Sequence, residues 1–162
     1  MEVKTGLGQD SHRFDEDSNK TLVLGGVPFP GHPALKGNSD ADVILHAITN
    51  SISSITGRNI LGGIADKMCL EEGITDSSEY LKIALQDLCH WKITHLAIAL
   101  ECKRPKISPK IDAIKKSVAK LLNIKPKDIG ITATSGEGLT AFGRGEGIQA
   151  QAILTVVNKG EK

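Results

Sequence analysis

Apolar and polar residues alternate along this chain with two different periods, about two and about 3.6 residues. Alternation of period two predicts strands over residues 3–14, 21–27, 93–101, 128–135 and 148–157. The last strand has the clearest pattern, because every second position is apolar: Ile148, Ala150, Ala152, Leu154 and Val156. The chain therefore carries two predicted strands near its start and three in its second half.

Helical spacing of apolar residues recurs in three segments. One helix is expected to begin within residues 39–42, where Ser and Asp can cap it, and its apolar stripe consists of Val43, Ile44, Ala47, Ile48, Ile52 and Ile55. A second fits residues 78–91. A third begins at Ser108 and Pro109 and ends before Pro126, and glycines and prolines make residues 25–37 a loop. This order predicts a single α+β domain over residues 1–162, with a mixed sheet covered by helices on one face.

Composition narrows the possible partners. The 162 residues are 40% apolar but 3% aromatic, so few rings are available to stack on nucleic-acid bases. The formal net charge is +1 without a basic block, so we expect neither a nucleic acid nor a membrane surface as a partner. The longest apolar run, residues 96–100, is too short for a signal peptide or a membrane span. Cys69, Cys89 and Cys102 lack C-x-x-C spacing, which favours reduced thiols in a cytoplasmic protein.

Three polar side chains could close around one metal ion. Asp10 and His12 would point the same way from an extended strand. At about 100° per residue, His46 lies roughly opposite the centre of the apolar stripe, so we expect it outside the core. Asp42, four residues earlier, could orient the imidazole of His46. One carboxylate and two imidazoles with an open position form a common ligand set for catalytic zinc.

Ordinary structural explanations also exist for these signals. A D-x-H triplet is common without a metal, and a lone histidine on a helix surface is more often solvated than functional. Residues 37–42, with the sequence G-N-S-D-A-D, favour the metal interpretation, because they hold more hydrogen-bonding groups than a helix cap needs.

Two further segments could bind phosphate. Residues 134–138 (T-S-G-E-G) and 143–147 (G-R-G-E-G) offer backbone N–H groups, a bidentate contact from Arg144 and a cation ligand in Glu137. A plain hairpin connection explains these glycines equally well. Residues 103–106 (K-R-P-K) lie between a strand and a capped helix, where a phosphate or nucleobase could bind, although a solvated basic turn is the simpler explanation.

Five motifs together resemble a known enzyme family. They are G-Q-D-S-H-R-F (8–14), S-D-A-D-V-I-L-H-A-I (39–48), R-P-K-I (104–107), A-T-S-G-E-G-L (133–139) and G-R-G-E-G-I (143–148). Their order is similar to that of the 2-C-methyl-D-erythritol 2,4-cyclodiphosphate synthases, zinc enzymes of the non-mevalonate isoprenoid pathway. The resemblance implies a lyase reaction, in which the 2-phosphate of 4-diphosphocytidyl-2-C-methyl-D-erythritol 2-phosphate attacks the β-phosphorus of its own diphosphate and expels CMP. It covers essentially the whole chain from about Gly6.

The resemblance also implies roles for individual residues. Asp10, His12 and His46 would hold one zinc ion per subunit, and Glu137 a second ion, Mg²⁺ or Mn²⁺. The diphosphate would contact Thr134 and Ser135, the cytidine would lie against residues 102–108, and Arg144 would face a phosphate or the trimer axis. The implied substrate contacts are Asp10, Ser11, His12, Asn38, Ser39, Cys102, Lys106, Thr134, Ser135, Gly136, Glu137 and Arg144, with Asn38 and Ser135 as the catalytic residues.

The chain departs from the family pattern in two places. Asn38 stands where the family usually has a histidine that helps to stabilise the reacting phosphates, and Asn cannot carry charge. Residues 59–67 replace a usual G-D-I-G segment and the F-P-x-T/D-D stretch after it, with Asp66 as one candidate substitute. Two alternatives to the cyclase stay open: a divalent-metal phosphohydrolase acting on water, and a trimeric metal-binding module with weakened catalysis.

The assembly follows from how much of the sheet this chain can cover. The strands over residues 93–101 and 148–157 are apolar at nearly every position, as expected when both faces are buried. No further element is left to cover the second face, so another subunit is the expected cover, and the resemblance supplies the symmetry. We expect a homotrimer with the sheets packed around a three-fold axis and the active sites between subunits.

Overall fold

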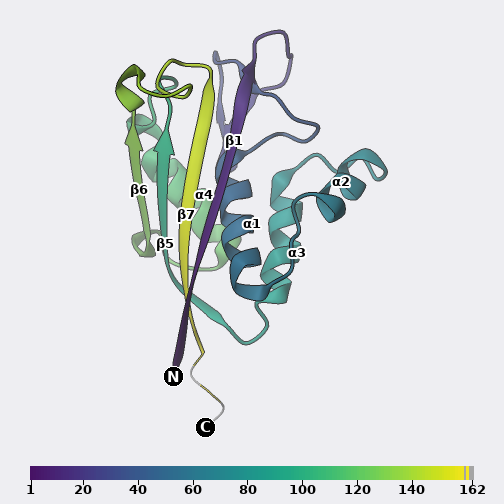
Figure 1. Ribbon diagram of the computed structural model, residues 1–162. Coiled ribbons are helices and arrows are strands. Elements are labelled where there is room, and N and C mark those ends of the chain that lie inside the picture. Colours follow the sequence, from purple (N-terminus) through teal and green to yellow (C-terminus); the bar gives the residue numbers. More distant parts are fainter. Residues whose placement is uncertain (159, 161–162) are drawn as a thin grey trace.

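The computed structural model describes residues 1–158 and residue 160. A five-stranded sheet has the order β4-β1-β7-β5-β6, and the helices lie on one of its faces (Figure 1). Its strands are β1 (Glu2–Asp15), β4 (Ala34–Leu35), β5 (Lys92–Glu101), β6 (Ile129–Thr134) and β7 (Gly147–Asn158). Only β5 and β6 pair in parallel among these strands. The predicted α+β fold with a mixed sheet and helices on one face is confirmed.

Alternation along β7 and β1 decides which side chains face the helices. The apolar residues predicted to share one side of β7, from Ile148 to Val156, are all 0% exposed. On β1 the buried positions include Gly6 and Gly8, where a Cβ would lie 2.0 Å from a carbonyl oxygen of helix α1 (Val43–Thr56). Glycine therefore lets the backbone of β1 pack directly on α1, and this contact brings the next two even positions, Asp10 and His12, beside the helix.

The helices differ in how they meet the sheet. Helices α1 and α4 (Ile111–Leu122) pack behind the strands, α3 (Ser77–Asp87) packs against α1, and α2 (Gly63–Leu70) lies beside α3, away from the sheet (Figure 1). The predicted third helix is confirmed in position, with the 3-10 helix η1 (Ser108–Lys110) before α4 and η2 (Pro126–Asp128) after it. Helix α2 was not predicted, because its apolar face is weak and buries a single residue, Ala65.

The boundaries of two other predicted helices move. Helix α1 begins at Val43 instead of within residues 39–42, because the Asp42 side chain caps it by accepting from the Leu45 N–H. Helix α3 ends at Asp87, before the predicted end at residue 91, and Cys89 just beyond it has a positive φ of 50°. No helix in the described part of the chain is long and apolar enough to cross a membrane.

The predicted strand over residues 21–27 is wrong in its extent. The chain reverses at Gly25 and Gly26, whose φ angles are 61° and 76°, so β2 (Leu22–Leu24) pairs with β3 (Val27–Phe29) in a separate two-stranded sheet. Both glycine N–H groups donate to the carboxylate of Asp42, at 2.8 and 2.7 Å. A contact from the start of α1 thus stabilises a turn that local alternation had extended into one strand.

Candidate functional site

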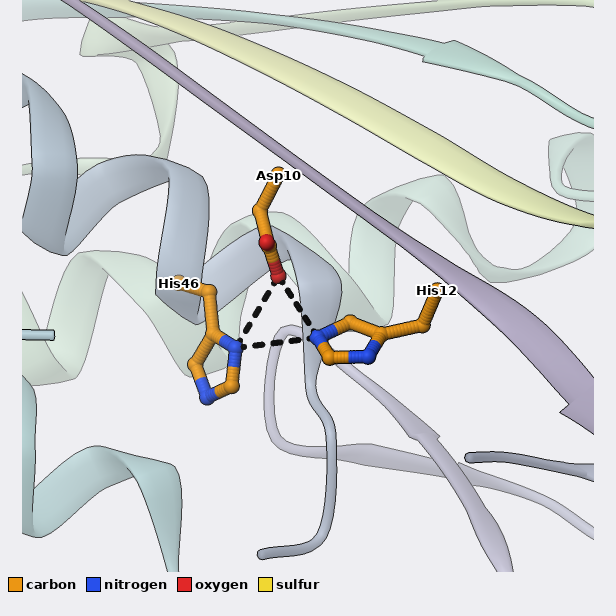
Figure 2. A group of neighbouring side chains, drawn as sticks. All are labelled: Asp10, His12 and His46. Carbon is orange, nitrogen blue, oxygen red and sulfur yellow. Dashed lines mark hydrogen bonds and ion pairs between the residues drawn. The ribbon is translucent and has the colours of Figure 1, made fainter. Parts of the chain in front are cut away.

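Asp10, His12 and His46 form one cluster, here called the metal corner (Figure 2). Asp10 and His12 come from one face of β1, as predicted, and His46 comes from α1. Asp10 Oδ2 lies 2.9 Å from His12 Nε2 and 3.0 Å from His46 Nδ1, and these two nitrogens are 3.4 Å apart. The three side chains therefore present one ligand atom each toward a common point.

The hydrogen bond at His12 Nδ1 determines whether His12 Nε2 presents a hydrogen or a lone pair to the metal corner. His12 Nδ1 lies 2.8 Å from the carbonyl oxygen of Lys36. A carbonyl oxygen only accepts, so Nδ1 carries the hydrogen and Nε2 presents a lone pair. A lone pair and a carboxylate oxygen 2.9 Å apart repel unless a cation lies between them. The donor set thus fits a divalent ion with an open coordination position, and a proton can take its place.

Charge coupling inside the metal corner agrees with this interpretation. Burial disfavours the ionised form of Asp10, but hydrogen bonds and attraction from His12 and His46 outweigh it, and the pKa of Asp10 falls from 3.8 to about 2. For His12, burial lowers the pKa while the hydrogen bond and charge of Asp10 raise it, and the net result is a raised pKa. The arrangement of these three side chains therefore favours a positive charge, a proton or a metal ion, beside the Asp10 carboxylate.

The expectation that His46 lies outside the core is wrong. Its residue is 7% exposed, because β1 covers one side of α1 and α3 packs against another, so the polar side of the helix is enclosed as well. The expectation that Asp42 orients the imidazole is also wrong. The Asp42 carboxylate is taken up by the N–H groups of Gly25, Gly26 and Leu45, and burial raises its pKa to about 6 against these bonds.

Ser77 replaces Asp42 as the partner of His46. Ser77 Oγ lies 2.8 Å from His46 Nε2 and donates to Asp40 Oδ1. Lys20 is a second residue that the sequence did not single out: its Nζ donates to the carbonyl oxygens of Gly37 and Ser39, at 2.8 and 3.1 Å. The surplus of polar groups in residues 37–42 was a visible signal for Asp40, but nothing local pointed to Ser77 or Lys20.

Three predicted substrate contacts, Ser11, Asn38 and Ser39, have different surroundings. Asn38 is exposed, and Ser39 is half-buried with its Oγ accepting from the Ala41 N–H. Ser11 points away from the helices, and it lines a cavity of about 270 Å³ together with His12, Arg13, Ala141, Phe142, Glu146 and Gly147. This cavity joins β1 to the last part of the glycine-rich loop (residues 134–147).

The glycine-rich loop presents exposed side chains on an ordered backbone. Thr134 Oγ1 accepts from the Gly136 N–H at 3.3 Å, and Ser135 Oγ accepts from the Glu137 N–H at 3.4 Å, within the 3-10 helix η3 (Gly136–Gly138). Glu137 has a positive φ of 51° and is exposed. Further along, Arg144 Nε donates to Glu146 Oε1 at 3.1 Å. The loop therefore has hydroxyl, carboxylate and guanidinium groups at its surface.

The segment proposed for cytidine follows β5 directly. Cys102 is buried, its Sγ donates weakly to the Pro105 carbonyl oxygen at 3.7 Å, and burial together with Glu101 raises its pKa to about 11. Lys106 is exposed, whereas Arg104 lies over the Phe14 ring and bonds to Glu16. Cys102 is thus a protonated thiol at neutral pH, and Lys103 and Lys106 are the exposed lysines of this segment.

The metal corner and the start of the glycine-rich loop are far apart within one chain. Sheet register places Ser11, Gln149, Glu101 and Thr134 in one row across β1, β7, β5 and β6. Three spacings of about 4.8 Å make this row about 14 Å long. Side chains of this row point away from the helices, whereas Asp10 and His12 point toward them. One chain therefore does not bring Thr134 to its own metal corner.

Asp66 is exposed in the first turn of α2, and the segment around it does not reach the metal corner through any hydrogen bond in the described residues. Residues 58–76 contact the segment before α1 through Thr75, whose carbonyl oxygen accepts from the Asp40 N–H at 2.9 Å.

Fold and site together define a small α+β protein with a carboxylate and two imidazoles arranged for one divalent ion. The chain belongs to the YgbB family, whose model matches residues 3–157. It is 51% identical over 156 residues to the 2-C-methyl-D-erythritol 2,4-cyclodiphosphate synthase of Chlamydia abortus, covering 95% of this chain and 89% of that protein.

Two solved structures extend the similarity to the fold. The bifunctional IspDF from Campylobacter jejuni superposes with a TM-score of 0.85 at 28% identity, over 96% of this chain and 42% of that longer one. The IspF of Plasmodium falciparum in complex with CDP gives a TM-score of 0.81 at 27% identity, over 98% of this chain and 97% of that one. The family resemblance read from the motifs is confirmed.

Proposed function

We propose that this chain is a 2-C-methyl-D-erythritol 2,4-cyclodiphosphate synthase, a phosphorus–oxygen lyase of the non-mevalonate isoprenoid pathway. Two observations together carry this function: a relative named for that activity is 51% identical over 95% of this chain, and Asp10, His12 and His46 converge on one point. The reaction forms a bond between a 2-phosphate oxygen and the β-phosphorus of the same molecule, and the α–β bridging oxygen leaves with CMP.

Such a reaction needs positioning and charge neutralisation more than a protein nucleophile. Holding the attacking oxygen near and in line with the phosphorus removes much of the barrier. Asp10, His12 and His46 would hold a divalent ion, which when bound supplies Lewis acidity to a phosphate oxygen. Thr134, Ser135 and the N–H of Gly136 would steady the diphosphate, and the exposed Lys106 would contribute to the nucleotide contact.

The ion identities are part of the proposal. One carboxylate with two imidazoles and an open position supports Zn²⁺ at the metal corner. For Glu137 we propose Mg²⁺ or Mn²⁺, because a hard cation can be held by a single carboxylate together with substrate phosphates.

The remaining substrate contacts stay as predicted from the family resemblance. Ser11, Asn38 and Ser39 would face the erythritol and its phosphate, with Asn38 supplying a hydrogen bond where the family usually has a histidine. Arg144 would reach a phosphate or the trimer axis after leaving Glu146. Asn38 and Ser135 are proposed as the catalytic residues, because each offers a neutral hydrogen-bonding group toward the reacting phosphates. Cytoplasmic location is supported by three free cysteines.

A homotrimer with active sites shared between subunits would explain why Thr134 lies far from the metal corner of its own chain. The helix-free face of the sheet exposes Leu7 by 61% and Ile153 by 45%, and it carries a cavity of about 200 Å³ between Ala97, Ala99, Gly130, Thr132, Gln151 and Ile153. A second copy on this face would bury that apolar surface. It would also bring Thr134 and Lys106 of one subunit toward the metal corner of its neighbour.

Product identification tests the reaction. Purified protein with Zn²⁺ and Mg²⁺ is incubated with 4-diphosphocytidyl-2-C-methyl-D-erythritol 2-phosphate, and phosphorus NMR follows the products. We expect CMP and a cyclic diphosphate in equal amounts. Open-chain products would indicate a phosphohydrolase, and metal binding without turnover would indicate a module that has lost catalysis; either result overturns the proposal.

Subunit mixing tests the shared site. His46→Ala protein and a Lys106→Ala, Thr134→Ala double variant are each expected to be inactive, and we expect activity to return when the two are refolded together. Refolding each variant alone is the control. An active protein that sediments as a monomer would contradict the shared site while leaving the reaction itself untouched.

A further inference from the structure

Ser77 and Asp40 form a chain of hydrogen bonds that ends on a proposed metal ligand. Ser77 is the first residue of α3 and is 0% exposed, and Asp40 lies in the segment before α1. Ser77 Oγ lies 2.8 Å from His46 Nε2, and the same hydroxyl contacts Asp40 Oδ1. The chain therefore approaches His46 from the side opposite to the metal corner, where His46 presents Nδ1.

Asp40 is held in place by three donors. Its Oδ1 accepts from the Asp42 N–H at 3.0 Å and from the Ser77 hydroxyl, and its Oδ2 accepts from the Ser77 N–H at 3.1 Å. The Asp40 N–H donates in turn to the carbonyl oxygen of Thr75 at 2.9 Å. The carboxylate is thus fixed between the start of α1 and the start of α3.

Hydrogen-bond direction along this chain follows from the chemistry of each group. A carboxylate only accepts, so the single hydrogen of the Ser77 hydroxyl points at Asp40. The Ser77 oxygen can then only accept from His46, which places a hydrogen on His46 Nε2 and leaves a lone pair on Nδ1. Nδ1 is the atom 3.0 Å from Asp10 Oδ2, on the side of the metal corner.

We propose that Ser77, fixed by Asp40, is a positioning residue that holds His46 in the tautomer and ring orientation in which Nδ1 binds the metal ion. Lys36 does the same for His12 through its carbonyl oxygen. Different groups thus orient the two imidazoles: a backbone carbonyl oxygen orients His12, and the Ser77–Asp40 pair orients His46. This inference rests on the proposed metal site. It adds the residues that orient the metal ligands in the metal-free protein.

The test compares Ser77→Ala with Ser51→Ala. Ser51 is also 0% exposed, but its hydroxyl donates to the Ile48 carbonyl oxygen at 2.6 Å within α1, remote from the imidazole. Nitrogen-15 NMR of metal-free protein reports which ring nitrogen of His46 carries hydrogen, and chelator competition gives the Zn²⁺ dissociation constant. Ser77→Thr keeps the hydroxyl, and Asp40→Asn replaces one of the two accepting oxygens by an NH2 donor and removes the charge.

In the parent protein and in Ser51→Ala we expect His46 to be protonated at Nε2. Ser77→Ala should show both tautomers and bind Zn²⁺ about 10- to 100-fold more weakly, Asp40→Asn should fall in the same range, and Ser77→Thr should stay near the parent. Equal losses in Ser77→Ala and Ser51→Ala, or an unchanged tautomer with unchanged affinity, would overturn the positioning role. Absence of Zn²⁺ binding by the parent protein would instead contradict the metal site itself.

Discussion

The metal corner and the glycine-rich loop differ in how far one chain completes them. In the metal corner each ligand side chain already has its partners, and the residue of His46 is only 7% exposed. In the glycine-rich loop the backbone is hydrogen-bonded, but Thr134, Ser135 and Glu137 remain exposed. A metal ion needs fixed ligand atoms, whereas a diphosphate can bring its own oxygens and a neighbouring subunit can bring the rest. Folding of one chain thus completes the first region, and we propose that substrate and a neighbouring subunit complete the second.

The largest expected effect comes from removing a ligand of the metal corner. His46→Ala should weaken Zn²⁺ binding by more than about 100-fold and abolish CMP release, because loss of a direct ligand exceeds the loss of an outer partner. It should also lower stability, since the ring is buried where β1 and α3 pack against α1. Elemental analysis and thermal unfolding measure both effects, with the exposed His32→Ala as the matched control. Full zinc content in His46→Ala would remove His46 from the ligand set.

Glu137→Gln tests the other side of the comparison. Zn²⁺ content and thermal stability should stay unchanged, because the side chain is exposed, whereas CMP release should slow about 100-fold and lose its dependence on Mg²⁺. A Mg²⁺ titration of activity measures this, beside Glu72→Gln, an exposed carboxylate beyond α2. An unchanged titration would make Glu137 an ordinary turn residue.

In the metal-free protein, the free energy of unfolding should depend on pH through the ionisable groups of the metal corner. Asp10 has its pKa lowered from 3.8 to about 2, so its contribution is complete above pH 3.8 and is lost as pH falls toward 2, about 2 kcal/mol in all. His12 has a raised pKa, so its contribution is complete below pH 6.5 and is lost as pH rises through the raised value. Denaturant unfolding at several pH values measures this profile.

Asp10→Asn should flatten both limbs of that profile, because it removes the carboxylate that titrates at low pH and the charge that raises the pKa of His12. Glu137→Gln should leave the profile unchanged, because it contacts neither histidine. A profile that Asp10→Asn does not alter would show that charges elsewhere in the protein determine the acid limb.

The smallest effects are expected at the cysteines. Cys102 is buried with a pKa raised to about 11, so it should resist alkylation at neutral pH, whereas the exposed Cys89 should react first. Replacing Cys69, Cys89 and Cys102 by Ala should leave activity within a few-fold. Mass spectrometry after iodoacetamide treatment gives the order of modification. Loss of zinc in the triple variant would contradict the assigned ligand set.

Several parts of this protein follow from local patterns alone. Period-two alternation places Asp10 and His12 on one side of β1, and it identifies the buried residues of β7, because side-chain direction along a strand depends only on the backbone of that strand. Pro109 marks the start of the helical segment in the same way, because it lies in the first turn of η1, which leads into α4. The predicted cap is wrong, because Ser108 lies inside η1 and the structure has no side-chain cap hydrogen bond there. The order of five motifs was sufficient to recognise the family.

Tertiary contacts decided what local patterns could not. His46 is buried because β1 and α3 enclose α1, and its partner is Ser77, 31 residues away, instead of Asp42, one helical turn away. Gly25 and Gly26 turn because Asp42 binds their N–H groups. Periodicity gives the direction of a side chain relative to its own element, but the energy of a buried polar group depends on which other element meets it, and only the packed chain determines that.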